Sequence, residues 1–123
     1  MTEFKNNYDL EQRTLDFSKS LIKLLKRVPK NQTIIPLLDQ CLRSGTSIGA
    51  NYREANGASS KKDFRNKIAI CKKEAKETLY WLELIATVIE DIKEKELVQK
   101  LRYLWSESKE YVLIFGKILG STK

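Results

Sequence analysis

The sequence predicts an all-α protein, an antiparallel up-and-down four-helix bundle that forms a single domain over residues 1–123. Three observations support this prediction. Apolar residues recur at spacings of three and four along four long segments, which is the period of an amphipathic helix. No segment has the alternating pattern of a β-strand. Only two prolines and five glycines interrupt the chain, so long helices joined by short links are expected.

The first helix is expected over residues 9–28. Asp9 is a plausible N-cap, and Pro29 lies just past the end of the helix. The residues expected to face the core follow the helical period: Leu10, Thr14, Phe17, Leu21, Leu24, Leu25 and Val28. A helix with one apolar stripe of this kind buries the stripe against its neighbours.

The second helix is expected over residues 34–55. Thr33 is a possible N-cap, and Pro36 is tolerated only in the first turn of a helix. Asn56 and Gly57 form a typical stop signal. The polar link from the first helix is short, which favours antiparallel packing of the two helices.

The third helix is expected over residues 60–91, because Ser60 and Asp63 resemble a capping box. The fourth is expected over residues 95–119, and Gly120 is expected to begin a frayed tail. The two apolar stripes are Phe64, Ile68, Cys71, Ala75, Leu79, Leu82, Ala86 and Ile89, then Leu97, Leu101, Leu104, Ser108, Tyr111, Phe115 and Ile118.

Two glycines in the second helix stand out from a chain otherwise rich in Leu, Ile, Lys and Glu. Gly45 and Gly49 fall on its core side, together with Leu42 and Tyr52. A glycine inside a helix costs about 1 kcal/mol relative to alanine. We therefore expect a neighbouring backbone to approach most closely at these two glycines.

The opposite face of the second helix combines small polar side chains with one arginine and one glutamate: Arg43, Ser47, Ala50, Asn51 and Glu54. This pattern indicates a docking surface or a polar network, and an ordinary solvated face is the alternative. On the third helix, Glu74, Glu77 and Trp81 flank the core stripe.

The two glutamates of the third helix are candidate partners for Arg43, within one chain or between two chains. They could instead be surface acids paired with Lys73 and Lys76. A catalytic carboxylate pair is the least favoured interpretation, because no further acid or histidine converges with them in the sequence pattern.

Positive charge is concentrated in two clusters. The chain has 23 Lys and Arg against 16 Asp and Glu, a net charge of +7. Such clusters favour polyanions, although Lys-rich faces also serve solubility. The candidate phosphate-binding residues are Lys19, Lys23, Lys26, Arg27 and Lys30 in one cluster, and Lys61, Lys62 and Arg65 in the other.

Several classes of function are disfavoured. The chain has no histidine, which removes the usual general base and the commonest metal ligand, and it has no glycine loop that would cradle phosphates. We expect no enzymatic activity, catalytic residue, cofactor, metal or small-molecule substrate. Cys41 and Cys71 fall on apolar faces and are expected to be reduced core residues. With no membrane-spanning run and no signal-peptide pattern, a cytoplasmic protein is expected.

Two motifs, RSGTSIGANYREANG and SSKKDFRNKIAICKKEAKETLYWLELI, resemble the bacterial 23S rRNA intervening-sequence proteins. That family's pattern is approximately R-S-x-x-S-I-x-x-N-x-x-E-G, then S-x-x-x-F, then E-x-x-Y-W-L, and the resemblance covers about residues 10–118. The chain has Glu-Ala-Asn-Gly where the family often places the acid closer to the glycine. The matching positions are Arg43, Ser44, Ser47, Ile48, Asn51, Glu54, Gly57, Phe64, Glu77, Tyr80, Trp81 and Leu82.

The resemblance implies a helical bundle that assembles into a ring-like homopentamer with a non-enzymatic role connected with RNA. Self-association is also expected because three helices carry more apolar residues than one stripe needs. The leading hypothesis is a homo-oligomer that binds structured RNA or a ribonucleoprotein through its basic surfaces. The alternative is an adaptor that docks a protein partner on the Arg43, Ser47, Asn51 and Glu54 face.

Overall fold

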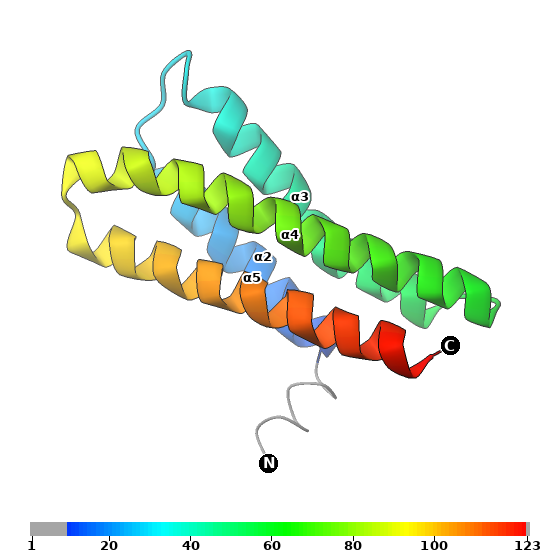
Figure 1. Cartoon of the computed structure of the whole chain (residues 1–123). Helices are drawn as coiled ribbons and strands as arrows, with labels where there is room; N and C mark the ends of the chain where they lie inside the picture. Colours follow the sequence, from blue (N-terminus) through cyan, green and yellow to red (C-terminus); the bar gives the residue numbers. More distant parts are fainter. Residues whose placement is uncertain (1–9, 123) are drawn as a thin grey trace.

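The computed structural model describes residues 10–122, and the described part folds into four helices packed against one another (Figure 1). The all-α bundle predicted from the sequence is therefore confirmed. The helices are α2 (Leu10–Arg27), α3 (Ile35–Asn56), α4 (Lys61–Ile92) and α5 (Lys95–Ser121). The predicted N-cap at Asp9 lies outside the described residues. Within residues 10–122, no helix has both the length and the apolarity that crossing a membrane requires.

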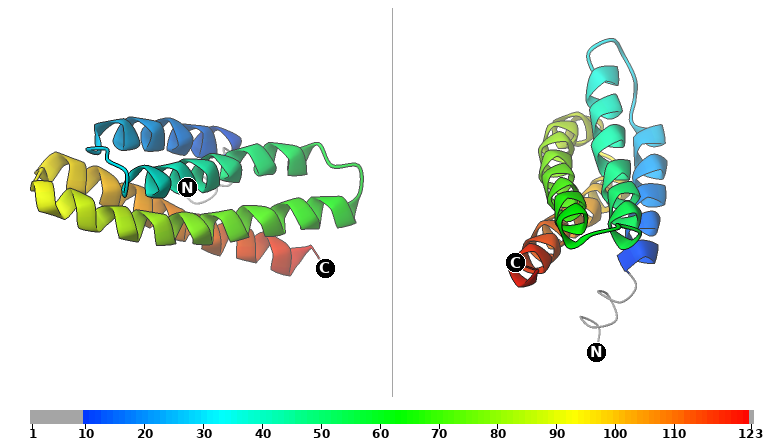
Figure 2. Two further views of the ribbon diagram at one scale, coloured as in Figure 1. Left: turned by 90° about the horizontal axis from the view of Figure 1, so that it is seen from above. Right: turned by 90° about the vertical axis from the view of Figure 1, so that its right-hand side faces the viewer.

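Neighbouring helices run in opposite directions, as the contacts between them show. The contacts that fix these directions are Arg13–Glu107 and Arg27–Glu94 between α2 and α5, Arg43–Glu77 and Glu54–Lys67 between α3 and α4, and Glu83–Trp105 and Arg65–Leu119 between α4 and α5. In each pair of helices, residue numbers rise along one helix as they fall along the other. The first turns of α3 project away from α4, whereas its later turns run beside it (Figures 1 and 2).

All four helices contribute residues of their apolar stripes to the core, although Leu79 of the predicted third stripe is not among them. Every residue predicted to form the stripe of the first helix is buried, as are the first six of the fourth helix. Cys41 and Cys71 are free thiols with no exposed surface, so the prediction of reduced core cysteines is confirmed. Burial raises the pKa of each thiol to about 12, which keeps both side chains neutral and compatible with an apolar interior.

Of the N-caps predicted for α3 and α4, the structure confirms the one at α4 and contradicts the one at α3. Ser60 precedes α4 and its hydroxyl accepts a hydrogen bond from the Asp63 backbone N–H at 3.0 Å. The prediction of Thr33 as the cap of α3 was wrong. The side-chain oxygen of Asn31 instead accepts hydrogen bonds from the backbone N–H groups of Thr33 and Ile34, at 2.9 and 3.0 Å. Asn performs this role because its amide oxygen reaches backbone donors two and three residues ahead.

The two core glycines of α3 lie in tight contact with α2. A Cβ at Gly49 would stand 3.0 Å from the Thr14 hydroxyl oxygen and 3.5 Å from the Thr14 carbonyl carbon. The prediction that Leu42 shares their core side was wrong, because Leu42 is 40% exposed. Leu42 lines an open groove between the end of α2 and the first turns of α3 and is not packed in the core.

The chain end is more ordered than predicted. Gly120 and Ser121 belong to α5 and do not form a frayed tail. The guanidinium of Arg65 on α4 donates hydrogen bonds to the Leu119 carbonyl at 2.7 Å and to the Thr122 hydroxyl at 3.1 Å. An arginine that bonds the last carbonyls supplies partners that a helix end otherwise lacks.

Candidate nucleic-acid interface and polar network

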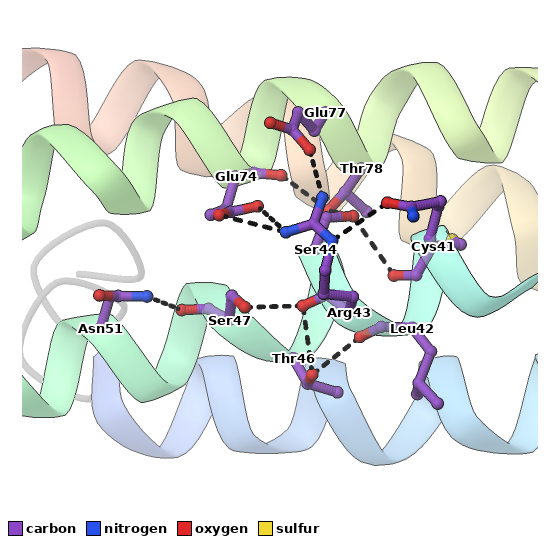
Figure 3. A network of polar contacts seen from close by, with 11 residues as sticks. Cys41, Leu42, Arg43, Ser44, Thr46, Ser47, Asn51, Glu74, Glu77 and Thr78 are labelled. Carbon is purple, nitrogen blue, oxygen red and sulfur yellow. Dashed lines mark hydrogen bonds and ion pairs between the residues drawn. The ribbon is translucent and has the colours of Figure 1, made fainter.

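Arg43 holds α3 against α4 within one chain. Its Nη1 donates to the Glu74 carboxylate at 3.2 Å, its Nη2 donates to Glu77, and its Nε donates to Gln40 at 3.1 Å (Figure 3). The hydrogen bond to Glu77 raises the pKa of Arg43 above its already high ordinary value. The arginine is therefore charged at neutral pH, and it binds two carboxylates of one neighbouring helix.

Below the Arg43 ion pairs, two hydroxyl side chains form a hydrogen bond in the core. The sequence analysis did not predict that these two residues would be partners. Ser44 and Thr78 are fully buried, and their hydroxyl oxygens lie 2.9 Å apart, between α3 and α4 (Figure 3). Thr78 Oγ1 also lies 2.8 Å from the Glu74 carbonyl, and Ser44 Oγ lies 3.4 Å from the Cys41 carbonyl. The sequence could have indicated this pair, because small hydroxyl residues stand at core positions of two helices that face each other.

The rest of the predicted docking face also bonds within the chain. Ser47 Oγ donates to the Arg43 carbonyl at 2.7 Å, and Asn51 Nδ2 donates to the Ser47 carbonyl at 2.9 Å. Glu54 forms an ion pair with Lys67 of α4, with 2.7 Å between Oε1 and Nζ. Trp81, predicted on the same network, instead packs against the core, and its indole N–H has no hydrogen-bond partner among residues 10–122.

Two residues of the basic cluster on α2 form contacts within the chain, and three form no ion pair with a described residue. Arg27 forms ion pairs with Glu94 and Glu96. The Lys30 ammonium lies 3.1 to 3.3 Å from the carbonyl oxygens of Val28, Leu25 and Lys26 at the end of α2. The remaining three, Lys19, Lys23 and Lys26, are exposed, and none forms an ion pair through its side chain with a described residue.

The second basic cluster lies at the opposite end of the bundle. Arg65 is half-buried and bonds the end of α5, while Lys61 and Lys62 are exposed in the first turn of α4. The Arg65 contact joins this end of α4 to the end of α5, whereas Arg27 joins the end of α2 to the start of α5. One subunit therefore presents two separate basic ends.

A groove between α2 and α5 brings together residues that the sequence analysis missed. It has a volume of about 460 Å³, and α5 contributes Gln99, Lys100 and Tyr103 to it, opposite Lys23 of α2. Tyr103 is 61% exposed. Its position outside the fourth apolar stripe, directly after Arg102, was the signal that an aromatic ring would face solvent beside positive charge.

A second groove lies between the end of α2 and the start of α3. It has a volume of about 490 Å³ and is mostly apolar. Three of its lining residues are exposed hydrophobics: Ile22 at 43%, Ile35 at 45% and Leu42 at 40%. No other part of residues 10–122 covers this apolar groove.

The fold and these surfaces define a four-helix-bundle protein with an internal arginine clamp, two basic ends and two surface grooves. Within the described part of the chain, no group of His, Cys, Asp and Glu residues could hold a metal ion. The sequence model of the 23S rRNA-intervening sequence protein family matches residues 6–111. The chain belongs to that family.

A solved structure supports the same assignment. The chain is similar to a protein of unknown function from the S23 ribosomal protein family of Bacteroides thetaiotaomicron, with 37% sequence identity and a TM-score of 0.74. The similarity covers 89% of this chain and 96% of that protein. No curated protein gives a significant match to the chain.

Proposed function

We propose that the protein is a non-enzymatic cytoplasmic homo-oligomer that binds structured RNA or a ribonucleoprotein. The observation that carries this proposal is the exposure of Lys19, Lys23 and Lys26 on α2 without carboxylate partners in the described chain. Lysines at spacings of four and three lie on one side of a helix and can contact successive phosphates. The family name refers to 23S rRNA, and the solved relative is assigned to a ribosomal protein family.

The contacts within the chain indicate which of the eight candidate basic residues are most available to bind phosphate. Arg27, Lys30 and Arg65 already bond carboxylates or helix ends, so an RNA phosphate would have to compete with these partners. Lys19, Lys23 and Lys26 need give up no such contact. We therefore assign the main phosphate contacts to these three lysines, with Lys62 as the clearest candidate at the other end.

The apolar groove between α2 and α3 supports the oligomeric part of the proposal. Apolar surface of this kind is stabilised when another protein surface covers it. Because the two basic clusters lie at opposite ends of one subunit, a cyclic oligomer would join like clusters into a continuous basic ring. The family resemblance implies five subunits.

The adaptor alternative has weaker support. A partner docking on the Arg43, Ser47, Asn51 and Glu54 face would meet side chains whose polar groups bond α3 or α4. Breaking those contacts offsets part of any docking energy. A salt-insensitive protein partner that is lost on Asn51→Leu would favour this alternative over RNA binding.

The test is fluorescence anisotropy of a labelled structured RNA at several salt concentrations, with the oligomeric mass determined on the same samples. We expect binding to weaken with a log–log salt slope of about −0.7 to −0.9 per phosphate contact. The double variant Lys23→Glu with Lys26→Glu should bind much more weakly, with a smaller slope. The matched control, Lys109→Glu with Lys117→Glu on α5, changes the net charge equally outside both clusters.

Three outcomes would count against the proposal. Absence of RNA binding by the wild-type protein at low salt would reject RNA recognition. Equal weakening by the α2 double variant and the α5 control would make the effect one of net charge and not of site. A monomeric mass for the RNA-binding species would reject the ring.

A further inference from the structure

The groove between α2 and α5 has a composition that differs from the apolar groove and from the rest of the surface. Ser20, Lys23 and Arg27 line it from α2, and Gln99, Lys100 and Tyr103 line it from α5. Two hydrogen-bonding groups, three cations, the carboxylate of Glu96 and an exposed aromatic ring therefore line one concave site of about 460 Å³. Each helix contributes cations, so the site exists only when the bundle is folded.

The carboxylates near this groove are partly compensated by in-chain cations. Glu96, which also lines the groove, shares Arg27 with Glu94. Glu107, one turn after Tyr103, shares Arg13 with Glu110, and Asp16 also acts electrostatically on Tyr103. Lys23 and Lys100 form no ion pair with a described residue, so they are the two cations of the site that remain available to a ligand.

Tyr103 lies at the surface and does not pack in the core. The side chain is 61% exposed, whereas Tyr111, two turns further along α5, is completely buried. An exposed aromatic ring between cations is the arrangement with which proteins hold single-stranded nucleic acid: the ring stacks on a base and the cations follow the backbone. A paired RNA helix cannot use such a ring, because its bases are already stacked on each other.

We propose that this groove binds an unpaired nucleotide of RNA, with Tyr103 stacked on the base and Lys23 and Lys100 on the flanking phosphates. Ser20 and Gln99 supply hydrogen-bonding groups for a base edge or a 2′-hydroxyl. The inference rests on the proposed function and narrows it: the recognised RNA carries a loop, bulge or single-stranded end. A protein partner fits less well, because most side chains that line this groove are polar or charged, whereas the groove between α2 and α3 is lined mostly by apolar ones.

The test compares two RNAs that differ in unpaired bases, namely a hairpin with a single-stranded uridine loop and a blunt duplex with the same number of phosphates. Tyr103→Ala should weaken hairpin binding by about tenfold and leave duplex binding within twofold. Tyr103→Phe keeps the ring and should bind like the wild type. Tyr80→Ala is the matched control, because Tyr80 is 57% exposed on α4 and lies outside the groove.

A second readout reports stacking directly. With 2-aminopurine in the hairpin loop, binding of the wild-type protein should quench the fluorescence, and binding of Tyr103→Ala at saturating concentration should not. Lys100→Gln should weaken binding of both RNAs and reduce the salt slope, because it removes a phosphate contact and not a stacking contact.

The outcomes separate the inference from the proposed function. If the wild type binds neither RNA, the proposed function fails and the inference with it. If the wild type binds RNA but Tyr103→Ala matches it on both probes, RNA binding stands and the nucleotide site is rejected. A changed oligomeric mass for Tyr103→Ala would identify Tyr103 as a subunit contact and would also reject the site.

Discussion

Gly45 of α3 lies directly against Leu21 of α2: a Cβ built on this glycine would stand 2.2 Å from the Leu21 Cδ2 atom. Real Cβ atoms do not approach another carbon so closely. Leu21 has no exposed surface, so its side chain is surrounded by the core and cannot swing away into solvent. The absence of a side chain at this position therefore sets how closely α2 and α3 pack.

Gly45→Ala should destabilise the protein even though alanine is the better helix former. The propensity gain is about 1 kcal/mol, but forcing a methyl group into a packed core costs about 1–3 kcal/mol. We expect a net loss of up to about 2 kcal/mol in the free energy of unfolding, measured by urea denaturation. Gly116→Ala is the control, because a Cβ there would meet only the end of Lys72, at 3.7 Å. That variant should be stabilised by a few tenths to about 1 kcal/mol, and equal effects of the two substitutions would contradict the packing argument.

Helical periodicity predicted the residues of α2 that face the core, and that stripe is buried from Leu10 to Val28. It misplaced Leu42 of α3, which lines the open groove beside the end of α2. On α4 it placed Leu79 in the stripe, whereas Thr78 and Ile85 are the buried residues there. A helical wheel assigns one direction to the core and has no information on where a neighbour ends.

Helical periodicity could not predict the candidate site, because the site depends on how the helices are positioned against one another. The partners of Arg43 could be narrowed to Glu74 and Glu77, but choosing a pairing within one chain required the register of α3 against α4. The groove beside Tyr103 forms from helices about 80 residues apart in sequence, so no local pattern could reveal it. Capping signals, which depend on neighbouring residues alone, were readable at Ser60.

Arg43→Ala should loosen the contact between α3 and α4 by a modest amount. The Glu74 side chain is only 11% exposed and loses its ionic partner, but the 46% exposure of Arg43 lets water replace part of the lost interaction. We expect a loss of about 1 kcal/mol in the free energy of unfolding. Arg53→Ala, an exposed position on the same helix, should change stability by less than about 0.5 kcal/mol.

The ion pair itself can be isolated by adding Glu74→Gln and completing a double-mutant cycle. A coupling energy of at least a few tenths of a kcal/mol is expected, because Arg43 and Glu74 are in direct contact. Additive effects of the two substitutions would show that the pair contributes nothing measurable. Arg43→Lys should not restore the contact, because an ammonium lacks the planar fork that reaches two carboxylates.

The buried cysteines predict a loss of stability in alkaline solution. Burial raises the pKa of Cys41 and Cys71 from 9.0 to about 12 in the folded protein. Between these values the unfolded chain releases thiol protons that the folded chain retains, so the free energy of unfolding falls as pH rises. Each thiol contributes a slope of about 1.4 kcal/mol per pH unit in the middle of this window. The Cys41→Ala, Cys71→Ala variant should show a shallower slope than the wild type above about pH 9, and parallel slopes would refute the assignment.

Lys93→Gly should stabilise the turn between α4 and α5. Lys93 has a φ of 56° and a ψ of 37°, the left-handed conformation, and its N–H donates to the Glu90 carbonyl as α4 ends. A side chain in this conformation costs about 1–2 kcal/mol, and glycine removes most of that cost while making the unfolded chain more flexible. We expect a net gain of about 0.5–1 kcal/mol in the free energy of unfolding. Lys95→Gly, inside the first turn of α5, should have the opposite sign because it places glycine in right-handed helix. If both substitutions destabilise the protein equally, the left-handed residue at Lys93 is not what ends α4.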